Sequence, residues 1–491
     1  MIPRRKVMVI GLDGLTLEVL LPLVEKGELP NFSRCLSNGS YGVLHSVTNM
    51  TTGSTWASFA TGCSPQMHGI IHDFHHRPDS YQLIPTSGRD CQRPPFWNTV
   101  TEMGGTSIVL NVPHTYPAQP VRGVILTGID TPSERASGFD YPRGAYRKLR
   151  RAGIDYIIDC GLASYIQNSQ IKAGRVVLER ETEARTRAAE YFMRQVNWDL
   201  FVTVYSLPDV WQHYYWSSLN SENDQPGREL IMSGYRLLDQ HLGRLLSRLP
   251  SDGVCIICSD HGFGPLCGTR DSLNAWLAEK GWLKRLRDQP RDSRGHIATW
   301  LLDQVRKHVS FRLRQQVLAS IPALRRRVES KLRMGGIDWA RTEVYAALDH
   351  QELWINLKGR QPLGRIERSD YDRLCEDISS ALLSWSDKST GKPIITAVHR
   401  QPYINYNNGS VLPPDLLLEW NPEAVHASPH PLITGDHAPQ GTIIITGAGI
   451  PHQILTPCSL IDVAPIALQA LGLSIPVTIE GQVPAGLLSN L

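Results

Sequence analysis

The chain has 491 residues, of which 41% are hydrophobic and 20% charged, with 50 Lys and Arg against 47 Asp and Glu. The net charge of +3 excludes a uniformly basic nucleic-acid-binding protein. The 40 Gly and 33 Pro follow no period, which excludes a collagen-like or low-complexity chain. A globular protein is therefore expected, built around one large α/β core or from several domains of roughly 150 residues each.

The start of the chain does not resemble a signal peptide. Met1–Lys6 leads into the apolar run Val7–Ile10, which is too short for the apolar region of such a peptide. No later segment has the roughly 18 consecutive apolar residues of a membrane-spanning helix. The nine cysteines are an odd number, so a complete disulfide framework is excluded and reduced thiols are the simpler interpretation. These features predict a soluble, cytoplasmic protein.

Short apolar runs rich in β-branched residues predict buried strands. In chain order they are Val7–Ile10, Ser107–Val112, Val124–Thr127, Phe201–Tyr205, Val254–Cys258 and Thr442–Thr446. Two long segments, Arg175–Val196 and Glu229–Leu246, have apolar residues at helical spacing. Continuous apolar strands alternating with amphipathic helices predict an α/β fold with a mainly parallel sheet and helices on both faces.

The segment 282–334 differs in charge from the rest of the chain. It contains 14 Lys and Arg but only four Asp and Glu. We expect a basic helical insertion there, between two parts of one discontinuous catalytic core formed by residues 1–281 and 335–491. Two interpretations stay open: a solvated helical face, or a lid that attracts anionic ligands.

Carboxylates follow three of the predicted strands. Asp13 comes after the first strand, Asp209 after Phe201–Tyr205, and Asp260 after Val254–Cys258. A single Asp after a strand is usually a helix cap or a turn residue. Ligands of open α/β sheets, however, bind beyond the carboxyl ends of the strands, so three carboxylates there predict one shared site.

Histidines complete a possible metal-binding set. His213 lies four residues after Asp209, which puts both side chains on one face of a helical turn. His261 directly follows Asp260, and His437 precedes another predicted strand. Three carboxylates and three imidazoles suffice for two divalent cations with three protein ligands each. Mixed Asp and His ligation suits Zn²⁺, and Mn²⁺ accepts the same ligands.

A hydroxyl-rich segment, Thr51–Gly62, runs into a predicted helix. The N-terminus of such a helix would offer N–H groups and a positive dipole end to a phosphoryl oxygen. Composition alone does not choose a nucleophile among Ser54, Thr55 and Ser58.

A series of short motifs resembles the alkaline-phosphatase superfamily, in particular its type I phosphodiesterase and nucleotide pyrophosphatase branch and the bacterial predicted phosphohydrolases or phosphomutases. The motifs are Gly11–Gly14, Trp56–Gly62 with His68–Ile70, Asn111–Pro117, Trp198–Phe201, Ser259–Gly264, Gly435–His437 and Asp462–Pro465. The resemblance runs over most of the chain. It is specific for the superfamily and says little about the substrate.

The resemblance implies a ligand set and a nucleophile. One metal ion would be held by Asp209, His213 and His437, and the other by Asp13, Asp260 and His261. Thr55 would be the nucleophile, bound to the second ion. The implied activity is hydrolysis of anionic phosphomonoesters or phosphodiesters through a phosphothreonine. A phosphomutase or phosphotransferase on the same site, or a catalytically silent binding protein, are the alternatives.

Two departures from related motifs bear on the substrate. The diesterase pattern has Pro-Asn where this chain has Ala57 and Ser58, which argues against nucleotide diesters. The segment Cys63–Met67 is similar to the sulfatase motif Cys-x-Pro-x-Arg, but the Arg is absent. A phosphate-ester substrate and no specific recognition of nucleic acid are therefore expected.

Overall fold

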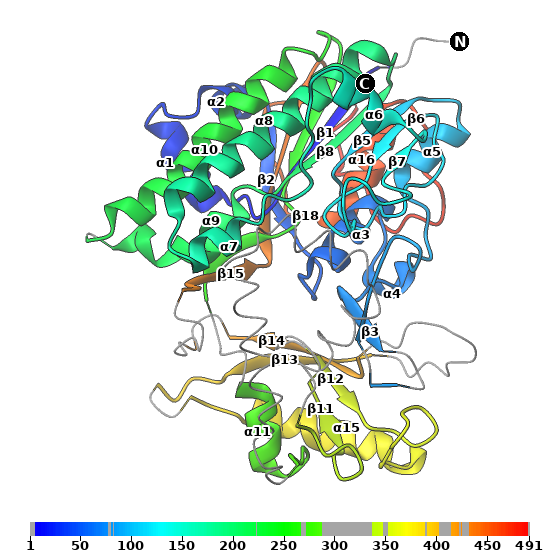
Figure 1. Cartoon of the computed structure of the whole chain (residues 1–491), viewed down its shortest axis with the longest axis vertical. Coiled ribbons are helices and arrows are strands. Elements are labelled where there is room, and N and C mark those ends of the chain that lie inside the picture. Colours follow the sequence, from blue (N-terminus) through cyan, green and yellow to red (C-terminus); the bar gives the residue numbers. More distant parts are fainter. Residues whose placement is uncertain are drawn as a thin grey trace. The chain divides into compact units, whose positions relative to one another are not determined.

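A computed structural model of the chain describes residues 5–76, 80–81, 83–221, 223–266, 272–286, 336–346, 352–387, 390–401, 414–421, 424 and 432–489. The chain forms two compact units, both drawn in Figure 1. Unit 1 comprises Met1–Asp73, Thr86–Gly264 and Thr434–Leu491, and unit 2 comprises Phe74–Pro85 and Pro265–Ile433.

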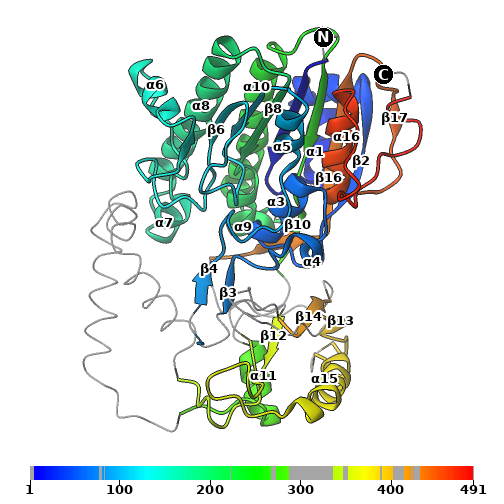
Figure 2. The same ribbon diagram turned by 90° about the vertical axis from the view of Figure 1, so that its right-hand side faces the viewer.

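Unit 1 contains a large, mostly parallel sheet, as predicted. Its strands are β1 (Val7–Leu12), β2 (Gly39–His45), β5 (Ser107–Leu110), β6 (Gly123–Leu126), β7 (Asp140–Tyr141), β8 (Leu200–Tyr205), β9 (Val254–Cys258), β16 (Gln440–Gly447), β17 (Gln453–Ile454) and β18 (Cys458–Ser459). The spatial order is β17-β2-β16-β9-β1-β8-β5-β6-β7, with β18 beside β2, and Figure 2 shows the strands from β6 to β17 side by side. The central strands β9, β1, β8, β5 and β6 are parallel, whereas β16 and β7 pair antiparallel with their neighbours.

Helices cover both faces of this sheet. They are α1 (Leu17–Glu25), α2 (Pro30–Ser37), α3 (Thr52–Thr61), α4 (Pro65–His68), α5 (Phe96–Glu102), α6 (Ala145–Arg151), α7 (Leu162–Gln167), α8 (Ile171–Gln195), α9 (Asp209–Tyr215), α10 (Gln225–Leu246) and α16 (Val463–Ala470), with short 3-10 helices at Trp216–Asn220 and Leu460–Asp462. The predicted strands and the two long predicted helices are all present, with ends shifted by a few residues. Among the helices of the described residues, none is long and apolar enough to cross a bilayer.

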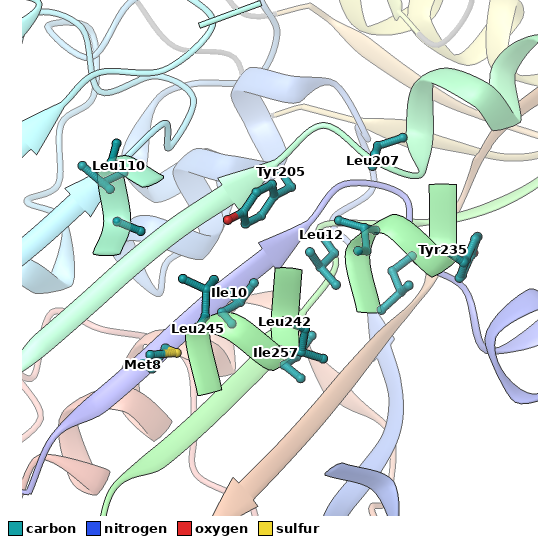
Figure 3. Packing of buried hydrophobic residues seen from close by; sticks show 14 of the residues in the cluster. Met8, Ile10, Leu12, Leu110, Tyr205, Leu207, Tyr235, Leu242, Leu245 and Ile257 are labelled. Carbon is teal, nitrogen blue, oxygen red and sulfur yellow. The ribbon is translucent and has the colours of Figure 1, made fainter. Parts of the chain in front are cut away.

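Two hydrophobic cores lie on the two faces of the sheet. Side chains of a strand point alternately to opposite faces, so Met8 and Ile10 of β1 enter one core and Val7 and Val9 the other. Figure 3 shows the first core, in which side chains of α10 such as Leu245 pack beside β1. Because both faces are buried, β1 reads as a continuous apolar run rather than an alternating one.

Unit 2 has its own small antiparallel sheet, in the order β11-β12-β14-β13. Its elements are the hairpin β3 (Phe74–His76) and β4 (Leu83–Pro85), α11 (Ser272–Lys280), β11 (Val344–Tyr345), β12 (Glu352–Ile355), α15 (Arg368–Leu383), β13 (Ile395–Arg400) and β14 (Leu416–Trp420). It therefore extends well beyond the expected insertion at 282–334. Of that segment only residues 282–286 belong to the described part, so the basic helical insertion and its lid role remain predictions.

A buried ion pair holds the core of unit 2 together. The Asp415 carboxylate is 3% exposed and accepts two hydrogen bonds from the Arg360 guanidinium, each 2.7 Å long. It also accepts from the Tyr371 hydroxyl at 2.6 Å and from the Ile355 N–H at 2.6 Å. Every hydrogen-bonding direction of this carboxylate is thus used inside the protein.

Replacing Asp415 by alanine should destabilise unit 2, because the change leaves the Arg360 guanidinium buried without a counterion. The expected loss in free energy of unfolding, measured by urea denaturation, is about 3–5 kcal/mol. Asp372→Ala is the matched control, since Asp372 makes only exposed ion pairs, with Arg368 and Arg400, and a much smaller loss is expected there. Equal, small losses in the two variants would contradict this interpretation.

Candidate active site

The carboxyl ends of three neighbouring parallel strands meet at one edge of the unit 1 sheet. β1 pairs with β8 on one side and with β9 on the other, so the residues that follow them come together. The Asp13 N–H donates to the Tyr205 carbonyl at 3.0 Å, and the Asp209 N–H donates to the Asp13 carbonyl at 3.1 Å. The residues Asp13, Asp209 and Asp260 therefore lie close together at this edge of the unit 1 sheet, as the sequence predicted.

One cluster at this edge consists of Asp13, Asp260 and His261. The His261 Nε2 lies 3.4 Å from Asp13 Oδ1 and 3.4 Å from Asp260 Oδ2. Each of the three residues offers one possible ligand atom, and these atoms all lie within 4.8 Å of one another. Asp260 and His261 are almost fully buried, whereas Asp13 is partly exposed. The cluster therefore combines two carboxylates and one imidazole in a confined space.

A second cluster consists of Asp209, His213 and His437. Asp209 is the first residue of α9, and His213 follows one helical turn later on the same face. His437 lies on β15 (Gly435–Ala438), which pairs with β10 (Gly262–Pro265). Asp209 Oδ1 lies 3.3 Å from His213 Nε2 and 3.5 Å from His437 Nε2, and the two Nε2 atoms are 3.1 Å apart.

The three imidazoles are oriented in the same way. His213 Nδ1 lies 3.1 Å from the Gly435 carbonyl, His261 Nδ1 lies 2.9 Å from the Gly262 carbonyl, and His437 Nδ1 lies 2.7 Å from the Met50 carbonyl. A carbonyl can only accept, so each Nδ1 carries a proton and each Nε2 faces its cluster. Metal-binding histidines are typically oriented by such a backbone contact.

The two clusters differ in their electrostatics. Burial, together with the negative charges of Asp260 and Asp209, raises the pKa of Asp13 well above its ordinary value. Burial acts in the same direction on Asp209, but His213 and His437 hold the pKa of Asp209 well below its usual range. Burial would lower the pKa of His437, yet the Asp209 carboxylate raises it to about 9.

The residues of both clusters fit divalent cations. Asp260 Oδ1 is buried and accepts no hydrogen bond from the described residues, and a buried carboxylate oxygen without a partner is costly. The crowding of three carboxylates that raises the pKa of Asp13 would be relieved by positive charge. Asp436, which the sequence analysis did not single out, offers a further ligand atom near His213 and His437. Its position inside the motif Gly435–His437 was the signal for it.

Helix α3 contacts the first cluster through Thr55. The Thr55 hydroxyl lies 2.8 Å from Asp260 Oδ2 and 3.1 Å from the Thr51 carbonyl. Gly11 of β1 permits this close approach, because a Cβ atom there would lie 2.5 Å from the Trp56 ring of α3. Thr55 is therefore held against the carboxylate that the resemblance assigns to the same metal ion.

The role of Thr55 as the attacking group stays a prediction, and its burial is the observation that bears on that role. Thr55 has 0% exposure, and its hydroxyl also contacts main-chain carbonyls of the preceding turn. Ser54 and Ser58 are likewise buried. Thr52, the first residue of α3, is partly exposed, and its carbonyl lies only 3.4 Å from the Thr55 hydroxyl. The sequence analysis did not consider Thr52, although it stands in the same hydroxyl-rich segment.

The histidine downstream of α3 has a structural role. His68 ends α4 with its ring buried, 2.9 Å from the Ser58 hydroxyl and 3.1 Å from the Ile70 N–H. Burial lowers the pKa of His68 to about 3, so the ring is neutral. These contacts connect α4 to α3 and leave Ser58 without the freedom of a nucleophile.

The fold and this edge of the sheet define the class of the protein, which is that of the alkaline-phosphatase-like hydrolases. The family model of type I phosphodiesterase / nucleotide pyrophosphatase matches residues 7–423, and the chain belongs to this family. The protein is accordingly a phosphoric ester hydrolase. Among curated proteins, no relative matches the sequence.

Solved structures with the same fold are distant in sequence. Phosphonoacetate hydrolase from Sinorhizobium meliloti 1021, in complex with phosphonoformate, is 14% identical with a TM-score of 0.56, over 96% of each chain. Murine ectonucleotide pyrophosphatase / phosphodiesterase 5, as an inactive variant in complex with AMP, is 14% identical with a TM-score of 0.53, over 97% of each chain. The human form of the latter protein is 14% identical with a TM-score of 0.52, over 96% of each chain.

Proposed function

We propose that the protein hydrolyses phosphate esters at a centre of two divalent cations, through a covalent phosphothreonine. One observation carries this proposal: two triads of carboxylate and imidazole groups adjoin each other, and every imidazole directs its Nε2 atom into a triad. Asp13, Asp260 and His261 would hold one cation, and Asp209, His213 and His437 the other. Zn²⁺ is the proposed metal, with Mn²⁺ as the alternative.

Such cations, when bound, would favour ionisation of a nearby hydroxyl and neutralise charge on the transferred phosphoryl group. The residues of the chain supply the remaining functions. The first turn of α3 presents backbone N–H groups to an anionic phosphoryl oxygen, and the dipole of a helix favours negative charge at that end. The Gly53 N–H already donates a hydrogen bond to Asp73 at 2.6 Å. The other N–H groups of this turn would therefore bind the phosphoryl oxygen.

The proposed nucleophile is the Thr52 hydroxyl, because it is the accessible hydroxyl of this turn. Its oxygen attacks phosphorus, and the bond from phosphorus to the leaving oxygen breaks. Water then attacks the phosphothreonine, the bond between phosphorus and Thr52 breaks, and free Thr52 and phosphate or a phosphomonoester result. In this scheme Thr55 is a positioning residue, which orients the Asp260 carboxylate by its hydrogen bond.

The substrate class rests on the family and on its relatives. The structures of the two related proteins contain phosphonoformate or AMP, and both ligands carry an anionic group with phosphorus at its centre. The inactive murine variant carries a threonine-to-alanine change, which fits a threonine nucleophile in that protein. The proposed location of the present protein is the cytoplasm, where its many thiols would stay reduced.

The test is a substrate panel with the metal-loaded protein. Bis(4-nitrophenyl) phosphate and 4-nitrophenyl phosphate are compared with 4-nitrophenyl sulfate, and release of 4-nitrophenol is measured. We expect turnover of at least one phosphate ester, none of the sulfate, and loss of turnover after chelation with recovery on adding Zn²⁺ or Mn²⁺. Transfer of phosphate to an added alcohol in place of water would favour the phosphotransferase alternative. Undiminished turnover after complete chelation would refute the two-cation centre.

A further inference from the structure

A separate pocket of about 380 Å³ lies within unit 1, against the side of α3 that faces away from Thr55. Ala57, Ala60 and Thr61 of α3 form part of its wall. With 3.6 residues per turn, these positions point to the side of the helix opposite Thr55. None of the six proposed metal ligands lines this pocket. It is therefore distinct from the metal-binding edge of the sheet.

The pocket is lined by cations and by no carboxylate. Arg89 and Arg93 come from the loop that precedes α5, and His114 comes from the loop that follows β5. Neither arginine forms an ion pair with a carboxylate of the described residues. Arg89 is exposed and Arg93 is half-buried, so both guanidinium groups are available to form charge-assisted hydrogen bonds with a bound anion.

Three buried polar atoms of the pocket residues lack hydrogen-bond partners in the part of the chain that the structure describes. They are Arg93 Nε, Asn98 Oδ1 and His114 Nδ1. His114 is only 6% exposed, and its Nε2 lies 3.6 Å from Asp73 Oδ1. A buried polar atom without a partner costs free energy, so three of them around one pocket indicate that a ligand or its bound water completes them.

The remaining wall is mixed: Gln92, Thr115 and Gln119 contribute polar groups, and the rest is apolar. The apolar part is formed by the Trp97 ring, the Ile125 side chain and three proline rings: Pro94, Pro95 and Pro113. A volume near 380 Å³ exceeds what an isolated inorganic anion fills and lies in the range of small-molecule sites, which combine apolar walls with a few directed polar groups.

We propose that this pocket binds a phosphate group carried on a small organic body, independently of the metal centre. The guanidinium groups of Arg89 and Arg93 would contact the phosphate, because the planar fork of arginine matches its oxygens. The apolar wall around Trp97 would contact the organic part. The pocket is thus a second phosphate-ester site on the nucleophile helix, reached from its other face.

Calorimetric titration of the metal-loaded protein with inorganic phosphate and with glycerol 3-phosphate tests the proposal. In Asp260→Asn treated with a chelator, both cations are removed, so anion binding in that preparation reports the pocket. Adding Arg89→Gln and Arg93→Gln to this variant should weaken the remaining binding at least about 10-fold, because charge-assisted hydrogen bonds are lost. Adding Arg143→Gln and Arg194→Gln, two exposed arginines outside the pocket, is the matched control and should leave the binding unchanged.

Three further measurements make the outcome decisive. Circular dichroism identifies a variant that fails to fold, and Arg93→Lys, which keeps the charge but loses the fork, should then give intermediate affinity. Glycerol 3-phosphate should bind more tightly than inorganic phosphate. Sedimentation with vesicles containing phosphatidic acid separates a lipid headgroup from a free ester as the source of the phosphate, and either result agrees with the proposal. Loss of all anion binding in the chelated Asp260→Asn protein, or equal affinities in the pocket and control variants, would overturn it.

Discussion

Replacing Asp260 by asparagine is expected to remove one cation from the protein and to lower kcat/KM for a phosphate ester by more than about 100-fold. Loss of a residue that only supports a metal ligand typically costs about 10–100-fold, and Asp260 is proposed as a ligand itself. Its carboxylate is 1% exposed, contacts Thr55 and His261, and has one oxygen without a hydrogen-bond partner in the described chain. An amide keeps the shape of this side chain but supplies no negative charge.

Metal content per chain, measured by plasma emission spectrometry, and steady-state kinetics check this expectation together. Asp252→Asn is the matched control, because Asp252 is exposed and precedes β9, the strand that Asp260 follows. The control should keep both cations and the full rate. An Asp260→Asn protein with undiminished metal content and rate would show that this carboxylate belongs to no metal centre.

The second large effect is expected at the first residue of α3. Thr52→Ala should lower kcat by at least about 10⁴-fold, because removal of a nucleophile abolishes covalent catalysis and leaves only the residual acceleration of the site. Metal content should stay at the parent value, since the proposed ligand triads do not include Thr52. The fall in kcat would therefore be caused by the missing nucleophile and not by loss of the bound cations.

Substitutions at Thr55 distinguish the two threonines. Thr55→Ser keeps the hydroxyl that bonds to Asp260 and should be close to the parent, whereas Thr55→Val should reduce metal affinity and rate together. Added Zn²⁺ should partly restore the rate of Thr55→Val but not that of Thr52→Ala. If Thr55→Val lost all turnover with full metal content and Thr52→Ala stayed active, Thr55 would be the nucleophile, as the motif comparison implied.

Much of the fold was predictable because unit 1 follows simple rules. Strands buried on both faces, such as β1 and β9, appear as continuous apolar runs, and their helices have regular apolar spacing. The convergence of the candidate ligands was predictable for the same reason, since Asp13 and Asp260 follow strands that are neighbours in the sheet. Once the strands are identified, the residues after them are the ones that meet.

Unit 2 could not be predicted in this way. Its strands have two to six residues and are separated by long connections, so no periodic pattern is long enough to read. Its hairpin β3–β4 comes from the middle of the unit 1 sequence, which no local signal reveals. The choice between Thr52 and Thr55 depends on burial, and the proposed phosphate pocket brings together helix α3, the loop before α5 and the loop after β5.

Identification of the covalent intermediate distinguishes a phosphothreonine at Thr52 from direct attack by water. The metal-loaded protein is mixed with bis(4-nitrophenyl) phosphate, quenched in acid during turnover, and digested, and the peptide containing Thr52–Thr61 is fragmented in a mass spectrometer. The proposed mechanism predicts one added phosphoryl or 4-nitrophenyl phosphoryl group on Thr52 of the parent protein. The group should be absent from Thr52→Ala and from the chelated protein. Rapid turnover with no modified hydroxyl anywhere in α3 would contradict this mechanism.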